Sequence, residues 1–243
     1  MLWNGFVLAV RAIRRNVLRS FLTILGVVIG VSAVIVMVTL GDGATQSVKD
    51  QINNLGSNLL MVRPGQHMGP GRDSAGAPPF KLADSEAIAT QIRSLDAVAP
   101  TVGASALVVH MANNWQTTVT GSTNAYFTSG NWTLANGRFF GEGEERAGKA
   151  VCVIGATVRR NLFGSHNPVG SQIRVKGFAC EVIGLLAAKG QGGFGMDADD
   201  TVVMPLRTVQ RRVTGRDDIS MLRVSVREGT SLSRATEEIT RLL

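Results

Sequence analysis

The chain has 243 residues, 44% of them hydrophobic and 18% charged, and its formal net charge is +7. Four arginines before residue 20 supply most of that charge, no acidic residue precedes Asp42, and the remainder is left at +3. With a single tyrosine and no basic stripe interleaved with aromatic residues, this composition excludes a typical nucleic-acid-binding protein. The length is enough to bury one large core or two smaller ones.

The apolar stretch at residues 20–40 is predicted to be a transmembrane helix. It contains no charged residue and has the roughly 20 residues that a bilayer core requires. A cleaved signal peptide is the main alternative, but the sequence after Leu40 reads Gly-Asp-Gly-Ala, which is not the usual cleavage pattern. A soluble core helix of this length would normally carry a polar stripe. The positive-inside rule places the N-terminus in the cytoplasm and everything after Leu40 outside.

Residues 1–19 are predicted to form a cytoplasmic amphipathic segment at the membrane surface. Apolar residues recur at helical spacing on one face, and the opposite face is basic. Such a helix lies with its apolar side in lipid and its basic side toward anionic headgroups. The simpler interpretation is that the arginines only set the topology, and both can hold. The basic residues are Arg11, Arg14, Arg15 and Arg19.

Small residues on one face of the transmembrane helix predict a place where a second helix packs. Gly26 and Gly30 form a GxxxG pattern, and Ala33 follows on the same side. Glycine is also common in membrane helices without any packing role, so this alternative stays open. Residues 41–56 are expected to continue the helix outward as a stalk, with Val48, Ile52 and Leu55 on its apolar side.

Residues 57–243 are predicted to fold as an α+β domain outside the membrane. The sequence alternates short apolar strands with short helices, which is typical of mixed sheets. Strands are expected at "NLLMV", 106–111, 116–121, "KAVCVIG", in a hairpin over 171–190, at "TVVMP" and at "MLRVSVRE". Helices are expected at about 84–95, at 156–164, directly after "TVVMP" and at 231–243.

Three stretches together resemble the MacB-type permeases of ABC transporters. They are "RAIRRNVLRSFLTILGVVIGVSAVIVMVTLGDGA", "LGSNLLMVRPG" and "LFGSHNPVGSQIRVKGFACEVIGLLAAKG". The resemblance covers the whole chain and implies a bacterial inner-membrane protein whose periplasmic domain has two lobes, the second covering about residues 122–215. It also implies a homodimer with a cytoplasmic ABC ATPase as partner, often with a periplasmic adaptor and an outer-membrane channel. The exported or extracted substrates would be drugs, peptides or lipoproteins.

Such permeases continue with three further membrane helices, so the sequence is expected to be shorter than its natural unit. This leaves a second hypothesis open: a single-pass, membrane-anchored periplasmic sensor or ligand-binding domain with no transporter. The two hypotheses differ in whether the natural reading frame continues into three more apolar stretches.

No catalytic, cofactor or metal site is predicted. A G-x-x-x-x-G-K-[ST] loop is missing, so ATP hydrolysis is expected on a partner. The run Gly190-Gln-Gly-Gly-Phe-Gly195 formally matches G-x-G-x-x-G but is followed by a poor helix opening, which favours a flexible loop. The three histidines have no partner at ligand spacing. Asp197, Asp199 and Asp200 lack the full calcium-loop pattern and are interpreted as a solvated acidic loop.

Cys152 and Cys180 are predicted to form a disulfide. Both lie in expected strands of one lobe and, by the predicted topology, in an oxidising compartment. A bridge would close a loop of about 29 residues and stabilise the fold by about 3 kcal/mol through loop entropy. The alternative is a pair of buried free thiols, because cysteine is also a common core residue.

Overall fold

The computed structural model describes residues 3, 11, 14–55, 58–65, 78–190, 197–227 and 229–243, without the side chains of residues 47–55. The chain divides into two compact units, Met1–Gln51 and Ile52–Leu243. The side chains that would form the apolar face of the stalk are not described; they are Val48, Ile52 and Leu55. The same is true of the apolar face predicted within residues 1–13. The expected helix at residues 1–19 is described only in part.

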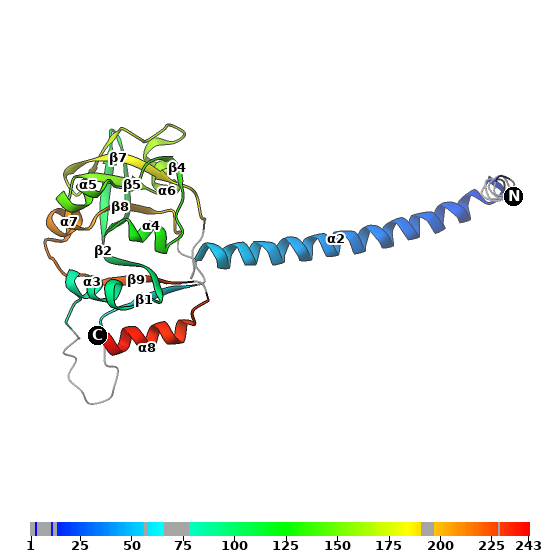
Figure 1. Cartoon of the computed structure of the whole chain (residues 1–243). Helices are drawn as coiled ribbons and strands as arrows, with labels where there is room; N and C mark the ends of the chain where they lie inside the picture. The colour runs from blue at the N-terminus through cyan, green and yellow to red at the C-terminus, as the bar shows by residue number, and fades with distance from the viewer. Residues whose placement is uncertain are drawn as a thin grey trace, which may run out of the picture. The chain divides into compact units, whose positions relative to one another are not determined.

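The first unit consists mainly of helix α2, which runs without interruption over Val17–Leu55 (Figure 1). Within the described residues, the segment Val17–Gln46 has the length and apolar composition of a membrane span, and its most apolar part is 0% buried. The hydroxyls of Thr23 and Thr39 donate to the backbone carbonyls four residues earlier, each at 2.8 Å. Such bonds satisfy the polar groups of an apolar helix from within the helix itself.

The second unit is a mixed α/β domain with one nine-stranded sheet that serves two lobes. Strand β2 (Leu95–His110) joins them: its first half pairs with β9 (Met221–Val226) and its second half with β3 (Asn113–Ser122). The predicted fold class, an apolar N-terminal helix followed by a two-lobed α+β domain, is therefore confirmed.

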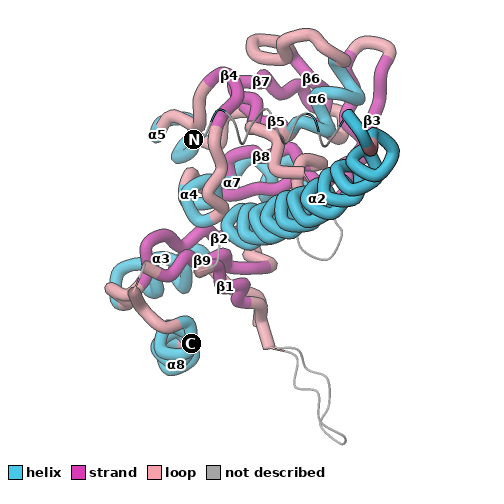
Figure 2. The backbone as a smooth tube through the Cα atoms, turned by 90° about the vertical axis from the view of Figure 1, so that its right-hand side faces the viewer, coloured by secondary structure: helices cyan, strands magenta, loops and turns pink. Residues whose placement is uncertain are grey.

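The smaller lobe combines residues from both ends of this domain. Its strands are β1 (Leu59–Val62), β9 and the first half of β2, and its helices are α3 (Leu82–Gln91) and α8 (Leu232–Leu242). Figure 2 shows these elements grouped together. The apolar face of α8 packs Ala235 and Ile239 into a core with Ile88 of α3 and with alternate residues of β9. Ser231 caps α8 by accepting a hydrogen bond from the backbone N–H of Arg234.

The larger lobe closes six strands into a circuit of pairings, in the order β2–β3–β8–β5–β7–β6 and back to β2. Its core takes inward residues from all six strands, as in a small barrel. A short strand, β4 (Leu134–Gly137), pairs with β7 outside the circuit. The other strands are β5 (Val151–Ile154), β6 (Gln172–Val175), β7 (Phe178–Leu186) and β8 (Thr201–Pro205).

Short helices cover this lobe. They are α4 (Ala125–Ser129), α5 (Glu142–Ala147), α6 (Ala156–Phe163) and α7 (Leu206–Val209), the last continued by a π-helical turn over Gln210–Thr214. Strand β3 also belongs to this lobe, because it pairs in parallel with β8. The sequence also predicted α3 to extend to about Leu95. In the structure Leu95 begins β2 instead, because it is buried opposite Val226 of β9.

Candidate functional site

The surface of α2 is open along its whole apolar part. The large apolar side chains between Val17 and Leu40 are exposed by 43% (Leu25) to 78% (Leu18). A Cβ added at Gly26 or Gly30 would meet nothing within 4 Å, and Ala33 is exposed on the same face. A surface this apolar is expected to be covered by lipid or by a second helix, and the predicted packing role of the three small residues stays a prediction.

The predicted basic group at the start of the chain is also exposed. Arg11, Arg14, Arg15 and Arg19 all lie at the surface. Their predicted contact with lipid headgroups is compatible with this exposure and stays a prediction.

Cys152 and Cys180 lie together in the core of the larger lobe as free thiols, both fully buried. Cys152 of β5 is opposite Val182 of β7, and Cys180 is two residues earlier on the same side of β7. Burial, followed by a hydrogen bond and a charge interaction with Cys180, raises the pKa of the Cys152 thiol well above its usual value. The structure thus brings the two cysteines into contact without a bond between them, and the disulfide stays a prediction.

Among the acidic residues at 197–200, Asp199 is buried rather than solvated as the sequence suggested, whereas Asp197 is exposed. The side chain of Asp199 is buried and accepts the backbone N–H groups of Lys189 and Gly190, each at 2.9 Å. Asp197 accepts from Thr157 at 2.6 Å, and Asp200 accepts from the indole N–H of Trp115 at 2.8 Å. The three carboxylates therefore tie the start of β8 to neighbouring loops and strands. Asp197 also accepts the backbone N–H of Asp199, but the other partners lie at least nine residues away, so the spacing could not reveal them.

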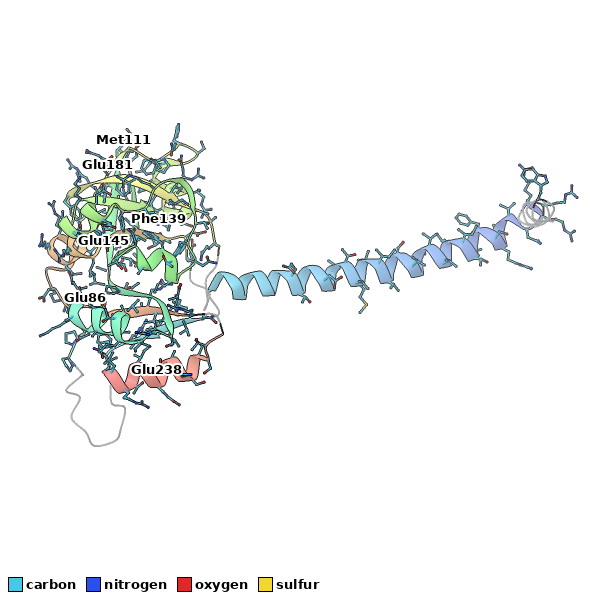
Figure 3. The ribbon with its side chains drawn as sticks, viewed as in Figure 1. Glu86, Met111, Phe139, Glu145, Glu181 and Glu238 are labelled. Carbon is cyan, nitrogen blue, oxygen red and sulfur yellow. The ribbon has the colours of Figure 1, made fainter. Side chains whose placement is uncertain are left out.

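The histidines do not form a metal centre with other ligands among the described residues, where no group of three or more His, Cys, Asp or Glu could hold a metal. His110 and His166 line a hollow of 590 Å³ near the end of the β2–β3 hairpin, where Figure 3 labels the exposed Met111. The Nδ1 atom of each histidine lies 3.0 Å from a backbone carbonyl. His67, Gly192 and Gly195 lie outside the described residues.

A group of aromatic and basic side chains around α4 could not be predicted from the sequence. Tyr126, Phe127 and Trp132 are buried in one cluster with Phe140, and Lys189 and Arg223 stack on two of these rings. Tyr126 and Phe127 belong to α4, Arg223 belongs to β9 and Lys189 follows β7. No periodic pattern in the sequence connects these positions. Only the fold brings them together.

The architecture and the sequence point to one family. A sequence model of the MacB-like periplasmic core domain matches residues 20–242. The chain belongs to this family. The resemblance drawn from the three motifs is confirmed.

Two MacB proteins each match nearly the whole of this chain. The macrolide export ATP-binding/permease protein MacB of Rhodospirillum rubrum is 41% identical over 239 residues, which are 97% of this chain and 36% of that protein. The protein of the same name from Azoarcus sp. is 36% identical over 235 residues, or 97% of this chain and 35% of that protein. The chain thus spans about a third of the length of these relatives.

Solved structures share the MacB-like fold. The periplasmic region of MacB from Actinobacillus actinomycetemcomitans has a TM-score of 0.65 with 20% identity, over 79% of this chain and 85% of that chain. The extracellular domain of YknZ, a noncanonic ABC-type transporter from Gram-positive bacteria, has a TM-score of 0.62 with 19% identity, over 76% of this chain and 92% of that chain.

Proposed function

We propose that this chain is the membrane subunit, or part of the membrane subunit, of a MacB-type ABC transporter. In this role it transmits the ATP-driven motion of a cytoplasmic ATPase to its periplasmic domain, for the export or extraction of substrates such as drugs, peptides or lipoproteins. The observation that carries the proposal is the family match over residues 20–242. The chain itself is proposed to be non-catalytic, because its sequence has no phosphate-binding loop.

The continuity of α2 supports a mechanical role. One helix runs over Val17–Leu55, so the apolar span and the residues that lead out of it share a single hydrogen-bonded backbone. A displacement at one end of a continuous helix reaches the other end, whereas a flexible connection would absorb it. We propose the organisation that the sequence suggests: a cytoplasmic segment at 1–19, a span at 20–40, a stalk at 41–56 and the periplasmic domain at 57–243.

The proposed partners follow from the same family assignment. They are a cytoplasmic ABC ATPase, a second copy of the chain, membrane lipid and, in a complete system, a periplasmic adaptor with an outer-membrane channel. The proposed location is the bacterial inner membrane, with the N-terminus in the cytoplasm. The exposed apolar face around Gly26 and Gly30 supports contact with a second copy.

Gly43 offers a test of this coupling. It lies inside α2, just beyond the proposed span, and a Cβ added there would meet nothing within 4 Å. In the full-length protein, Gly43→Pro removes a helix hydrogen bond and places the proline ring against the preceding turn, which kinks or breaks the helix. We expect substrate export, and ATPase activity stimulated by substrate, to fall at least several-fold in vesicles that contain the partner ATPase.

Gly43→Ala is the matched control, because it occupies the same open position and strengthens the helix. It should export as well as the unmodified protein. Both variants should give the same pattern of protease-resistant fragments from the periplasmic domain. Full export by Gly43→Pro would remove the continuous helix from the mechanism. If the protein is isolated from membranes and no ATPase is attached to it, this result would favour the hypothesis of a membrane-anchored sensor.

A further inference from the structure

A hollow of 460 Å³ lies in the smaller lobe, between the end of α3 and helix α8. One wall is formed by the segment from Gln91 to Ser94, and the other by residues of α8. A hydrogen bond joins the two walls, because the Ser94 hydroxyl donates to Glu238 at 2.7 Å, and Figure 3 labels Glu238 on α8. The hollow is therefore held by a contact between two elements that are distant in the sequence.

Three guanidinium groups and one carboxylate line this hollow. The guanidinium groups are those of Arg93, Arg234 and Arg241, and the carboxylate is that of Glu238. Both oxygens of the carboxylate are occupied, because Oε2 accepts from Ser94 and Oε1 accepts from the Nε of Arg234 at 3.1 Å. These hydrogen bonds, first that of Ser94 and then that of Arg234, lower the pKa of Glu238. Glu238 is thus charged at neutral pH and compensates one arginine.

Arg93 and Arg241 have no such partner in the part of the chain that the structure describes. Both are exposed, and neither side chain takes part in an ion pair there. The side chains that line the hollow therefore carry an excess of two positive charges. A guanidinium group has a planar fork of N–H donors and no acceptor, so it matches the oxygens of an anion.

We propose that Arg93, Arg234 and Arg241 form a binding site for the phosphate group of a ligand. A phosphate monoester carries close to two negative charges at neutral pH and three acceptor oxygens, which match the excess charge and the donors of the hollow. Ile92 and Leu242 also line the hollow, and its volume is in the range of small-ligand sites, so it has room for more of the ligand. The site does not depend on whether the chain serves a transporter or a sensor.

Nuclear magnetic resonance of the full chain in detergent micelles tests this directly. In protein labelled with ¹⁵N-serine, the backbone amide of Ser94 reports from the wall of the hollow, and Ser94→Ala assigns its signal. We expect this signal to shift with saturation on titration with inorganic phosphate at constant ionic strength. Chloride at the same ionic strength should produce no saturable shift. The amide of Ser122, which is buried in the larger lobe, reports any general effect of salt.

Substitutions identify the groups that bind the phosphate. Arg93→Gln and Arg241→Gln should each weaken the binding by about tenfold, because each removes a charged hydrogen-bond donor. Both residues are exposed, so neither substitution removes a buried side chain. Arg211→Gln is the matched control, because Arg211 is an exposed arginine in the π-helical turn of the larger lobe. This variant loses the same charge and should bind phosphate as well as the unmodified chain.

Two further titrations distinguish the possible sources of the phosphate group. Glycerol 3-phosphate represents a soluble ligand, and micelles that contain phosphatidic acid represent a lipid headgroup. The source that saturates the shift of the Ser94 signal at the lower concentration of phosphate groups is the one that the site prefers.

The unmodified chain is sufficient to contradict the proposal. A Ser94 signal that does not shift with inorganic phosphate, or shifts without saturation, would overturn it. An equal saturable shift in the Arg93→Gln, Arg241→Gln double variant would do the same. If a glutamine variant loses its fold, which the Ser122 signal reports, Arg93→Lys and Arg241→Lys keep the charges and should retain saturable binding.

Discussion

Single buried side chains hold the larger lobe together through partners that are distant in sequence. Cys152 and Cys180 point into the core of the six-stranded circuit, and Asp199 holds the backbone before β8 to that after β7. The two thiols are in contact but unbonded, and the pKa of Cys152 is raised because the site is dry. In the reduced, folded protein the Cys152 thiol is therefore expected to react slowly at neutral pH, since the thiolate is the reactive form.

If the domain lies in the periplasm, the two thiols should be oxidised to a disulfide. Protein prepared from the periplasm, unfolded and alkylated without reductant, should show no added label by intact-mass measurement. The same sample reduced first should take up two labels. Reduction should also lower the melting temperature, because the bridge is worth about 3 kcal/mol for a loop of this size. Two labels without reductant would show that the thiols stay free.

At the scale of elements, α2 is distinctive because it exposes apolar side chains all round and has small residues on one face. Gly26 and Gly30 are separated by about 40° around the helix at 100° per residue, so they face a neighbour together. Backbones that approach this closely gain dispersion contacts along the whole face. Bulky side chains at both positions would hold two helices apart.

We expect Gly26→Leu with Gly30→Leu, in the full-length permease, to reduce association between copies in the membrane and to reduce export with it. The matched control is Val28→Leu with Ile35→Leu, which changes the opposite face of the same helix. Energy transfer between labelled copies measures association, and transport in vesicles measures export. Export and association that both match the control would exclude this face as a contact.

At the scale of the whole molecule, charge sets the expected orientation in the membrane. The arginines before the span are not accompanied by any acidic residue, and Asp42 is the first charged residue after it. An excess of arginine on one side of a short apolar helix keeps that side in the cytoplasm. The rest of the chain would then fold outside.

Reporter fusions measure this orientation. Alkaline phosphatase, which is active only after export, should be active when fused after Gly65. A reporter that works only in the cytoplasm should be active when placed before Arg11. As an internal check, exchange of the two reporters should abolish both activities. Reversed activities would contradict the orientation and the proposed function together.

Most of the elements could be predicted because their signals are local. Helix α2 follows from the length of its uncharged apolar run, and β9 and α8 follow from the periodicity of their apolar residues. The strands β5 and β8 were recognisable as short apolar runs, because a strand that is buried on both faces is apolar at nearly every position. The family could also be recognised, since its motifs are contiguous in the sequence.

Other features were decided only by tertiary structure, because they depend on contacts between distant residues. Leu95 was predicted to end a helix and instead begins β2, since pairing with β9 buries it and outweighs local helical propensity. The acidic residues before β8 were assigned to solvent, yet Asp199 is buried where backbone N–H groups 9 and 10 residues earlier supply its hydrogen bonds. The sequence by itself determined which segments are apolar, helical or extended. The fold decided that Lys189 stacks on Trp132 and that Arg223 stacks on Tyr126, because these contacts join segments that are far apart in the sequence.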